Sequence, residues 1–231
     1  MKRFWTKVDV VESGAGRGIA LDGRPLKTPA RATLVLPAPS LADAVAQEWR
    51  ECGEEIDPRR MPMTGLANAA IDRVAPDPAA FAAQLARYAE ADLLCYRAEG
   101  PSSLLERQAA AWDPPLEWAR RRFDVTFVVT HGLMHVDQPR ATVDRLSRSL
   151  QAQDPFRLAA LSPLITIGGS LVTALALLEQ ALTVDELVAA VTLDEQWQID
   201  KWGADAEAEA VLAARAADLR SAARFLDLLR G

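Results

Sequence analysis

The sequence predicts an α+β protein in which a small β-containing N-terminal domain precedes a mainly α-helical C-terminal domain. Short β-patterned runs separated by turn residues occupy about the first 37 residues. From Ser40 onward, apolar residues recur at helical spacing, and neither an internal repeat nor a low-complexity linker interrupts them. Half of the 231 residues are apolar, so the chain can bury a sizeable core. The change in pattern places the boundary within residues 75–100, and we expect domains 1–90 and 91–231.

The expected strands lie at residues 4–11, 19–21 and 33–36. The clearest turn signal is Asp22-Gly23, because glycine adopts the positive φ of a tight hairpin turn without steric cost. Two prolines, Pro25 and Pro29, follow this turn, where they hold the second arm extended and remove donors from the ladder. Taken alone, this segment predicts an edge hairpin with protective polar residues.

Three helices are expected to complete the N-terminal domain. The first should begin at Ser40, which has the residue type of an N-cap, with Asp43 three residues later in the capping-box position. Thr64 should cap a second helix that ends before Pro76. The third should span residues 78–91, because Pro78 suits the first turn of a helix.

Beyond residue 100 the chain is predicted to be almost entirely helical. The longest expected helix spans residues 102–123 and contains Pro114 and Pro115, whose missing backbone donors predict a kink. Only residues 125–130 have β character in this part of the sequence. Further helices are expected at residues 139–151, 155–161, 164–180, 184–202 and 204–229. An amphipathic stripe is expected on the last helix, formed by Leu212, Leu219, Ala222, Leu226 and Leu229.

Charge and composition exclude several classes of protein. The net charge of −6 argues against general affinity for nucleic acid or for an anionic membrane, both of which require a basic face. Cys52 and Cys95 suit a reducing compartment and the role of small buried hydrophobic residues. The most apolar window, residues 158–178, is broken by a proline and two glycines, so a membrane-spanning helix is not expected. We expect a cytoplasmic protein without membrane insertion, and the preference for Arg and Ala is typical of a GC-rich bacterial genome.

No familiar catalytic or metal-binding pattern is present in the sequence. Gly14, Gly16 and Gly18 lack the strand–turn–helix context of a phosphate loop and predict a hairpin tip instead. His131 and His135 lie four residues apart in a β-like or turn segment, whereas a zinc site that catalyses needs three ligands and an open position. The sequence contains no Gly-x-Ser-x-Gly elbow and no cysteine set at metal-ligand spacing. We therefore predict neither enzyme activity nor a bound cofactor.

Tryptophans and carboxylates remain as candidate binding residues. Each of the six tryptophans is expected in the core, except that Trp202, which precedes Gly203 at a helix break, should be partly exposed. Acidic residues gather near the C-terminus, and at the start of the last helix the helix dipole stabilises their charge. Two interpretations stay open for them, a solvated acidic face and a functional patch for a basic partner. The acidic residues are Asp194, Glu195, Asp200, Asp205, Glu207 and Glu209.

Several segments, taken in chain order, indicate a family. They are Leu21-Asp22-Gly23-Arg24-Pro25-Leu26-Lys27-Thr28-Pro29-Ala30, Met61-Pro62-Met63-Thr64-Gly65-Leu66-Ala67-Asn68-Ala69-Ala70-Ile71-Asp72-Arg73-Val74, Asp92-Leu93-Leu94-Cys95-Tyr96-Arg97-Ala98-Glu99, Arg107-Gln108, Trp112-Asp113-Pro114-Pro115-Leu116-Glu117-Trp118, Gly169-Ser170-Leu171-Val172 and Leu193-Asp194-Glu195-Gln196-Trp197-Gln198, with Trp202-Gly203 last. In this order and at these spacings, the chain resembles the assembly chaperones that serve the α subunit of the ATP synthase catalytic head, the F(1) sector. The resemblance extends over nearly the whole length.

The resemblance implies a small α+β domain followed by a helical bundle. It also implies that the protein binds the free α subunit before α pairs with β, prevents its aggregation, acts stoichiometrically and needs no nucleotide. We expect the protein to act as a monomer. The partner-binding residues expected from the acidic start of the last helix and its surroundings are Asp194, Glu195, Trp202, Asp205, Glu207 and Glu209.

Two alternatives stay open. One is an adaptor that serves a different protein client. The other is a small hydrolase or transferase with an unrecognised site, which predicts a deep pocket holding a carboxylate of strongly shifted pKa. The sequence alone does not identify the contact surface.

Overall fold

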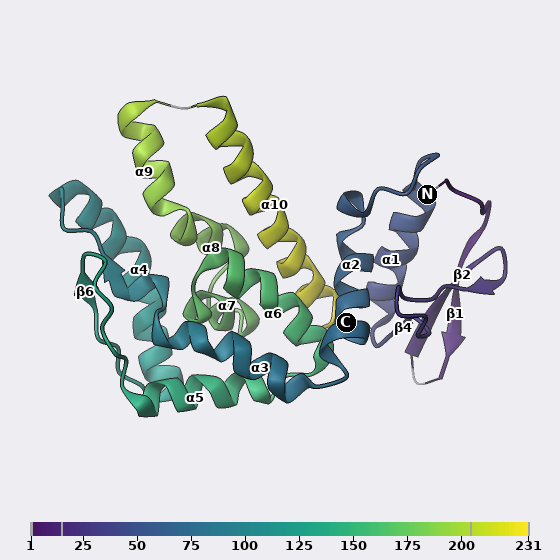
Figure 1. Ribbon diagram of the computed structural model, residues 1–231, viewed down its shortest axis with the longest axis horizontal. Helices are drawn as coiled ribbons and strands as arrows, with labels where there is room; N and C mark the ends of the chain where they lie inside the picture. Colours follow the sequence, from purple (N-terminus) through teal and green to yellow (C-terminus); the bar gives the residue numbers. More distant parts are fainter. Residues whose placement is uncertain (1, 15, 204, 231) are drawn as a thin grey trace. The chain divides into compact units, whose positions relative to one another are not determined.

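The computed structural model describes residues 2–14, 16–203 and 205–230, and it divides the chain into two compact units (Figure 1). Unit 1 comprises Met1–Pro78, Asp154–Ala160 and Ser221–Gly231, and unit 2 comprises Ala79–Gln153 and Leu161–Arg220. Strands and helices are both present, so the predicted α+β class is confirmed. The expected division of the chain at residue 90 stays a prediction.

Unit 1 contains a small antiparallel sheet. Its central strand β2 (Gly16–Leu21) pairs with β1 (Val8–Ser13), β3 (Arg24–Pro25) and β4 (Val35–Leu36). The turn between β2 and β3 is Asp22-Gly23, with φ values of +48° and +77°, which confirms the predicted tight hairpin. The glycine-rich stretch lies in the β1–β2 hairpin, as predicted, with Ala15 outside the described residues.

Two carboxylates fix the segments around this sheet. The Asp22 carboxylate accepts hydrogen bonds from the backbone N–H groups of Lys7 (2.8 Å) and Thr6 (3.1 Å), and these bonds hold its pKa below the usual range. The Asp72 carboxylate accepts one bond from the Thr28 hydroxyl (2.7 Å) and one from the N–H of Ala30 (3.0 Å). The segment that follows the Asp22-Gly23 turn is therefore attached to residues 70–74 within unit 1.

The helices of unit 1 begin differently from the sequence-based expectation. Helix α1 (Pro39–Glu51) has Ala38 at its N-cap, and the Ser40 hydroxyl donates instead to the carbonyl of Leu228 (2.6 Å), so the predicted Ser40 cap is wrong. Helix α2 (Pro62–Ala69) likewise begins before Thr64 and continues as the π-helical turn η2 (Ala70–Val74). Each helix begins with a proline, Pro39 or Pro62, which suits the first helical position, and the hydroxyl groups of Ser40 and Thr64 bond to residues distant in the sequence.

Thr64 and its neighbours bind a carboxylate from α1. Glu48 accepts hydrogen bonds from the N–H groups of Met63 (2.7 Å) and Thr64 (2.8 Å) and from the Thr64 hydroxyl (2.7 Å). A carboxylate at the start of a helix satisfies free N–H groups and complements the helix dipole. Partial burial raises the pKa of Glu48 above its usual range. Glu48 thus links α1 to the first turn of α2.

Unit 2 is mainly helical, with one short parallel pair of strands. The pair consists of β5 (Tyr96–Arg97) and β6 (Thr130–His131), so most of the expected β segment 125–130 is not strand. Helices α6 (Pro155–Gly168) and α10 (Ala206–Leu228) contribute residues to both units. The remaining helices are α3 (Pro78–Ala86), η3 (Arg87–Glu90), η4 (Leu93–Cys95), α4 (Ser102–Phe123), α5 (Arg140–Gln151), α7 (Leu171–Leu178), α8 (Val184–Val191) and α9 (Leu193–Trp202).

Two predicted helix boundaries in unit 2 are wrong. Helix α6 continues through Pro163, and the break falls at Gly169, whose φ of +73° is accessible to glycine at little cost. Ser170 then caps α7 through a bond that its hydroxyl accepts from the N–H of Thr173 (3.1 Å). The expected helix 184–202 is also divided, because the chain leaves the helical path at Thr192 between α8 and α9. By contrast, α4 spans the predicted range and contains both prolines.

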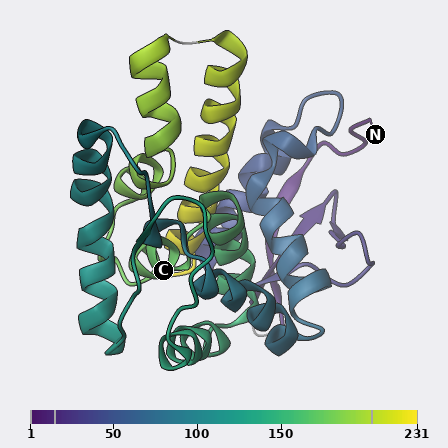
Figure 2. The same cartoon turned by 60° about the vertical axis from the view of Figure 1, so that its left-hand side comes forward.

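The core of unit 2 lies along one face of α4, which contacts α7, α8 and α9, and Figure 2 shows this helix at the left edge of the view. At its centre the Trp112 side chain is 1% exposed, and its indole N–H donates to the carbonyl of Ala190 (2.8 Å). The Arg97 guanidinium lies over the same ring, 5.1 Å from its centroid. The core cluster consists of Leu94, Cys95, Trp112, Leu116, Ala119, Val172 and Ala190.

Asp92 is a fully buried carboxylate beside this core. It accepts hydrogen bonds from the N–H groups of Leu94 (3.1 Å) and Val172 (3.0 Å), and Ser170 and Leu171 donate to it as well. The residue therefore connects η4 to the first turn of α7. Burial raises its pKa to about 6, against the opposing influence of these donors. Among the described residues, no helix is both long and apolar enough to cross a bilayer.

Cys95 is expected to react slowly with thiol reagents in the native protein. Its side chain is fully buried, and burial raises the pKa of the thiol to about 12, so the reactive thiolate is scarce near neutral pH. In a Cys52→Ala background, labelling of Cys95 should become fast only when denaturant is added. A Leu133→Cys variant of the same background supplies an exposed thiol as a positive control, since Leu133 is 98% exposed. Fast labelling of native Cys95 would contradict the expectation.

Candidate functional site

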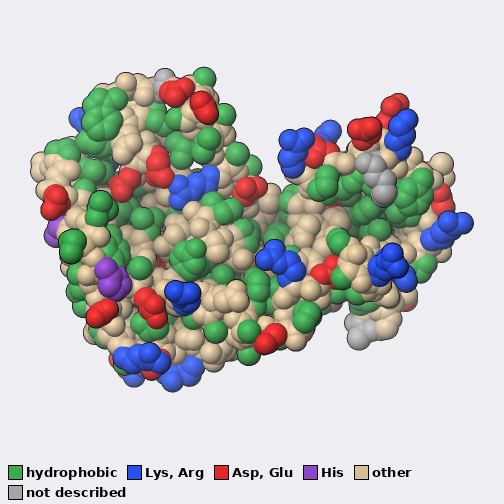
Figure 3. Space-filling model, in the orientation of Figure 1, with side chains coloured by type: hydrophobic (Ala, Val, Ile, Leu, Met, Phe, Trp, Pro, Cys, Tyr) green, Lys and Arg blue, Asp and Glu red, His purple; other side chains and the backbone are tan. Residues whose placement is uncertain are grey.

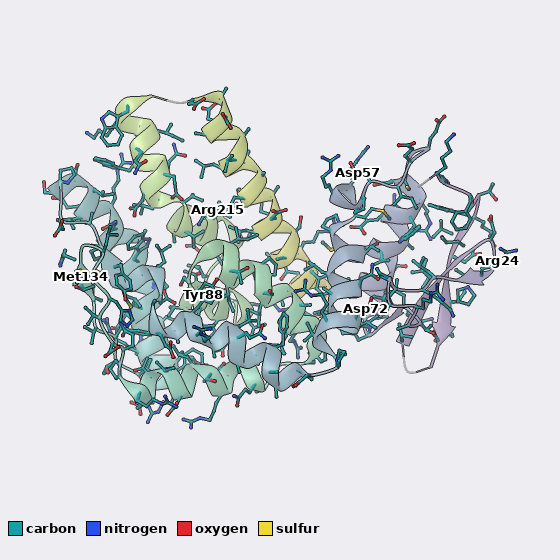
Figure 4. All side chains as sticks on the ribbon, viewed as in Figure 1. Arg24, Asp57, Asp72, Tyr88, Met134 and Arg215 are labelled. Atoms are coloured by element: carbon teal, nitrogen blue, oxygen red, sulfur yellow. The ribbon has the colours of Figure 1, made fainter. Side chains whose placement is uncertain are left out.

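An open groove lies between α9 and α10 in unit 2, and it has a volume of about 540 Å³. Both ribbon views show the two helices as antiparallel neighbours, and Figure 4 shows Arg215 between them. Helix α9 ends at Gly203, which has a φ of +91° and donates its N–H to the carbonyl of Ile199 (2.9 Å). The groove is lined by Glu195, Gln198, Ile199, Trp202, Gly203, Asp205, Glu207, Ala208, Val211, Leu212 and Arg215.

Large apolar side chains in this groove are open to solvent. Trp202 is 75% exposed, which confirms the expected exposure, and Val211 is 62% exposed. The Trp202 ring meets the ring of Trp197 edge-on, with 5.6 Å between centroids, and Trp197 itself is buried. A contiguous group of exposed apolar residues with polar residues at its margin is typical of a protein interaction surface.

Arg215 holds the groove together, and sequence analysis missed it. Its guanidinium pairs with Glu195 (2.6 Å) and donates to the carbonyls of Ile167 (2.8 Å) and Val191 (3.1 Å). These bonds satisfy carbonyl groups near the ends of α6 and α8, where helical partners are lacking. A signal was available, because Arg215 is the one cation between Glu207 and Asp218 in an alanine-rich stretch.

The structure brings together most of the expected partner-binding residues. Glu195, Trp202, Asp205 and Glu207 all line the groove between α9 and α10. Asp194 lies elsewhere and accepts a hydrogen bond from the Gln108 side chain (2.8 Å), which links α9 to α4. Glu209 faces a second groove that also contains Arg220.

The charges in the first groove are unevenly balanced. Glu195 is neutralised by Arg215, whereas neither Asp205 nor Glu207 forms an ion pair with any residue in the described part of the chain. The Asp205 carboxylate accepts from the N–H of Glu207 (3.0 Å) at the start of α10. Figure 3 shows acidic and apolar side chains together at the top of the view, where α9 ends and α10 begins. The groove therefore carries, beside its apolar wall, two carboxylates that have no ion-pair partner among the described residues.

The alternative of an enzyme with an unrecognised active site predicts a carboxylate whose pKa is strongly shifted. Asp92 and Glu48 have raised pKa values, but each accepts several hydrogen bonds from the start of a helix, where a negative charge has a structural purpose. Asp200, near the groove, has a lowered pKa because Arg107 donates to it (2.7 Å). Within the described residues, no three His, Cys, Asp or Glu side chains are arranged to hold a metal ion.

A second exposed apolar group lies in the turn after β6. Leu133 and Met134 are 98% and 81% exposed, and Figure 4 labels Met134 at this position. The preceding Gly132 has a φ of +80° and donates its N–H to the carbonyl of Arg97 (2.8 Å). His135 follows, and its ring nitrogens contact the Tyr96 hydroxyl (3.3 Å) and the Asp137 carboxylate (3.1 Å). This turn provides a comparison surface because its exposed apolar residues lie outside the groove between α9 and α10.

Comparison with known proteins gives one consistent family. The model of the family described as ATP12 chaperone protein matches residues 2–120. The crystal structure of Atp12 from Paracoccus denitrificans is 41% identical, with a TM-score of 0.93 over 99% of this chain and 98% of that chain. A crystal structure from Agrobacterium tumefaciens is 40% identical, with a TM-score of 0.94 over 99% and 86% of the two chains. Protein atp12, mitochondrial, of Schizosaccharomyces pombe is 26% identical over 214 residues, which cover 87% of this chain and 74% of the yeast protein.

Proposed function

The chain belongs to the ATP12 chaperone family, and from this membership we propose that it binds the free α subunit of the ATP synthase F(1) sector before that subunit pairs with β. In this proposal the protein acts in the cytoplasm as a stoichiometric chaperone, not as an enzyme, and it binds as a monomer. The family match and the nearly full-length structural similarity support the chaperone function. The choice of the α subunit rests on the sequence resemblance.

The physical need for such a chaperone follows from how the F(1) head assembles. An unassembled subunit exposes a large surface that its permanent neighbours will later cover, and such obligate interfaces are prone to wrong association. A chaperone that protects this surface must also release it. Its contact should therefore be moderate in area and partly electrostatic, so that the permanent neighbour can displace it.

The groove between α9 and α10 supports this proposal best. It combines an exposed tryptophan with uncompensated carboxylates, and large aromatic residues are frequent energetic centres of protein interfaces. We include Glu195, Trp202, Asp205 and Glu207 in the proposed contact, while Asp194 and Glu209 lie outside the groove. Since Glu195 is held by Arg215, Asp205 and Glu207 are the carboxylates available to a basic partner surface.

Co-purification with separately expressed α and β subunits from the same organism tests the function. We expect retention of α and not of β, and retention should weaken in an Asp205→Lys, Glu207→Lys variant because cations replace the free carboxylates. A single Glu209→Lys variant is the control for charge reversal on the same helix, since that residue lies outside the groove. Retention of neither subunit at any salt concentration would contradict the proposal and favour an adaptor for another client.

A further inference from the structure

We propose that the groove between α9 and α10 binds an amphipathic helical segment of the partner, in which lysine or arginine lies beside an apolar stripe. The inference deepens the proposed function, on which it rests, by stating the chemistry of the bound segment. It depends on three properties of the groove: its apolar wall, its excess of negative charge and the helical nature of both its sides.

The apolar wall fixes one side of the segment. Trp202 and Val211 are mostly exposed, and Ile199, Ala208 and Leu212 extend the same lining. Exposed apolar area of this kind gains stability when another apolar surface removes it from water. The bound segment must therefore present apolar side chains toward α9 and α10.

The charged side chains of the groove determine which charged residues the bound segment carries beside its apolar stripe. Arg215 is the one cation among the described residues that line the groove, and Glu195 and two backbone carbonyls already occupy its guanidinium. Asp205 and Glu207 remain without an ion-pair partner among the described residues. An acidic segment would meet uncompensated like charge, whereas lysine or arginine would meet two free carboxylates.

The sides of the groove favour a helix over an extended segment. An extended peptide gains affinity chiefly by adding a strand to a free sheet edge, where backbone groups are available to pair. Side chains of two helices line this groove, and backbone groups within helices are already hydrogen-bonded. A helix bound here satisfies its own backbone groups and presents only side chains to the groove.

The groove is also held in shape before a partner arrives. Trp202 rests against the buried ring of Trp197, and Gly203 ends α9 directly beside it. On the opposite helix, the bonds of Arg215 attach α10 to Glu195 and to the carbonyls of Ile167 and Val191. A groove that needs little ordering on binding retains more of its interaction energy as affinity.

Two synthetic peptides of opposite charge test the inference with the full chain. Each is a peptide of about 14 residues with leucine at the i, i+3, i+4 and i+7 positions, which form one apolar stripe when the peptide is helical, and the remaining positions are lysine in one peptide and glutamate in the other. We expect the lysine peptide to bind and the glutamate peptide to bind at least about tenfold more weakly. Binding of the lysine peptide should fall at about 1 M salt, where the Debye length shrinks to about 3 Å.

Matched variants locate the binding site. We expect Trp202→Ala to lower the affinity for the lysine peptide about tenfold, the usual effect of removing an important interface residue. The double variant Asp205→Asn, Glu207→Gln should lower this affinity by a similar factor. Met134→Ala removes an equally exposed apolar residue elsewhere in unit 2, and Glu209→Gln removes a charge from the same helix outside the groove. Both controls should bind as the unmodified protein does. Equal binding by groove variants and controls would overturn the inference.

Failure of this inference is distinguishable from failure of the proposed function. If the α subunit is retained equally by the groove variants and the unmodified protein, the chaperone function stands and the groove is not the docking site. If α is not retained by any form but the lysine peptide still binds in the groove, the choice of client is wrong and the binding chemistry stands. Circular dichroism of each variant confirms that the fold is unchanged.

Discussion

Replacing Asp92 with alanine is expected to lower the free energy of unfolding by about 3–5 kcal/mol, because several buried donors lose their acceptor at once. The N–H groups of Leu94 and Val172 bond to its two oxygens, and Ser170 and Leu171 also donate to them. Asp92 is fully buried, so solvent water cannot reach these donors and accept their hydrogen bonds in place of the carboxylate. Urea denaturation followed by circular dichroism measures the loss.

Two further variants separate this effect from a general loss of charge. Asp92→Asn keeps one carbonyl oxygen but turns an NH₂ group toward donors, so its stability should lie between those of the native protein and the alanine variant. Asp137→Ala removes a carboxylate whose side chain is 99% exposed, and we expect a change within about 0.5 kcal/mol. A loss below about 1 kcal/mol for Asp92→Ala would contradict the structural role.

The pH dependence of stability provides a second test of Asp92. Burial raises its pKa to about 6, above the value of about 3.9 in an unfolded chain. Between these two pH values the folded state holds a proton that the unfolded state has released, so this group makes the protein less stable as pH rises. Relative to Asp92→Asn, the native protein should lose up to about 3 kcal/mol between about pH 4 and pH 6. If the native protein instead gained stability relative to Asp92→Asn as the pH rises, the hydrogen-bond donors would lower the pKa of Asp92 by more than burial raises it.

Trp112→Ala is expected to be the most destabilising truncation of a tryptophan in this protein, with a loss of about 3–5 kcal/mol in the free energy of unfolding. The substitution opens a cavity in the core of unit 2 among Leu94, Leu116 and Val172. It also removes the N–H donor of the buried Ala190 carbonyl and the ring beneath Arg97. Tryptophan fluorescence and circular dichroism during urea denaturation measure the effect.

The same substitution at Trp202 is the natural control. Trp202 is 75% exposed, so Trp202→Ala should change stability by only about 0.5 kcal/mol while it weakens partner binding. Trp112→Phe should retain much of the core volume and lose chiefly the indole bond to Ala190. If Trp112→Ala and Trp202→Ala lowered the free energy of unfolding equally, the assignment of Trp112 to the core and of Trp202 to the surface would be wrong.

Local patterns in the sequence predicted features that depend on neighbouring residues. The Asp22-Gly23 turn, the span of α4 and the exposure of Trp202 beside Gly203 are all of this kind. Features that depend on distant partners could not be predicted in the same way. Ser40 and Thr64 have the residue type of helix caps, but their hydroxyl groups bind Leu228 and Glu48.

In the candidate site, too, features set by neighbouring residues could be predicted, and features set by residues distant in the sequence could not. Trp202, Asp205 and Glu207 were predicted because they lie close together in the sequence at the end of α9 and the start of α10, and Glu195 was predicted with them from the acidic first turn of α9. The groove that they share was not, since it depends on Val211 and Arg215 from the next turns of α10 and on carbonyls at Ile167 and Val191. Asp194 has the right charge, but its bond to Gln108 is visible only in three dimensions.

The attachment of the Asp22-Gly23 segment to Asp72 has an evolutionary consequence. Thr28 and Ala30 bind Asp72 inside unit 1, so one of the segments that carry the family resemblance maintains the architecture of that unit. The family model covers residues 2–120, whereas the groove belongs to residues 195–215. If the proposed groove is the docking site, selection for a different client can act on the α9–α10 hairpin without changing the bonds between Asp72 and the segment that follows Asp22-Gly23. Exchanging that hairpin between two relatives should transfer client preference and leave the fold of the rest of the protein unchanged.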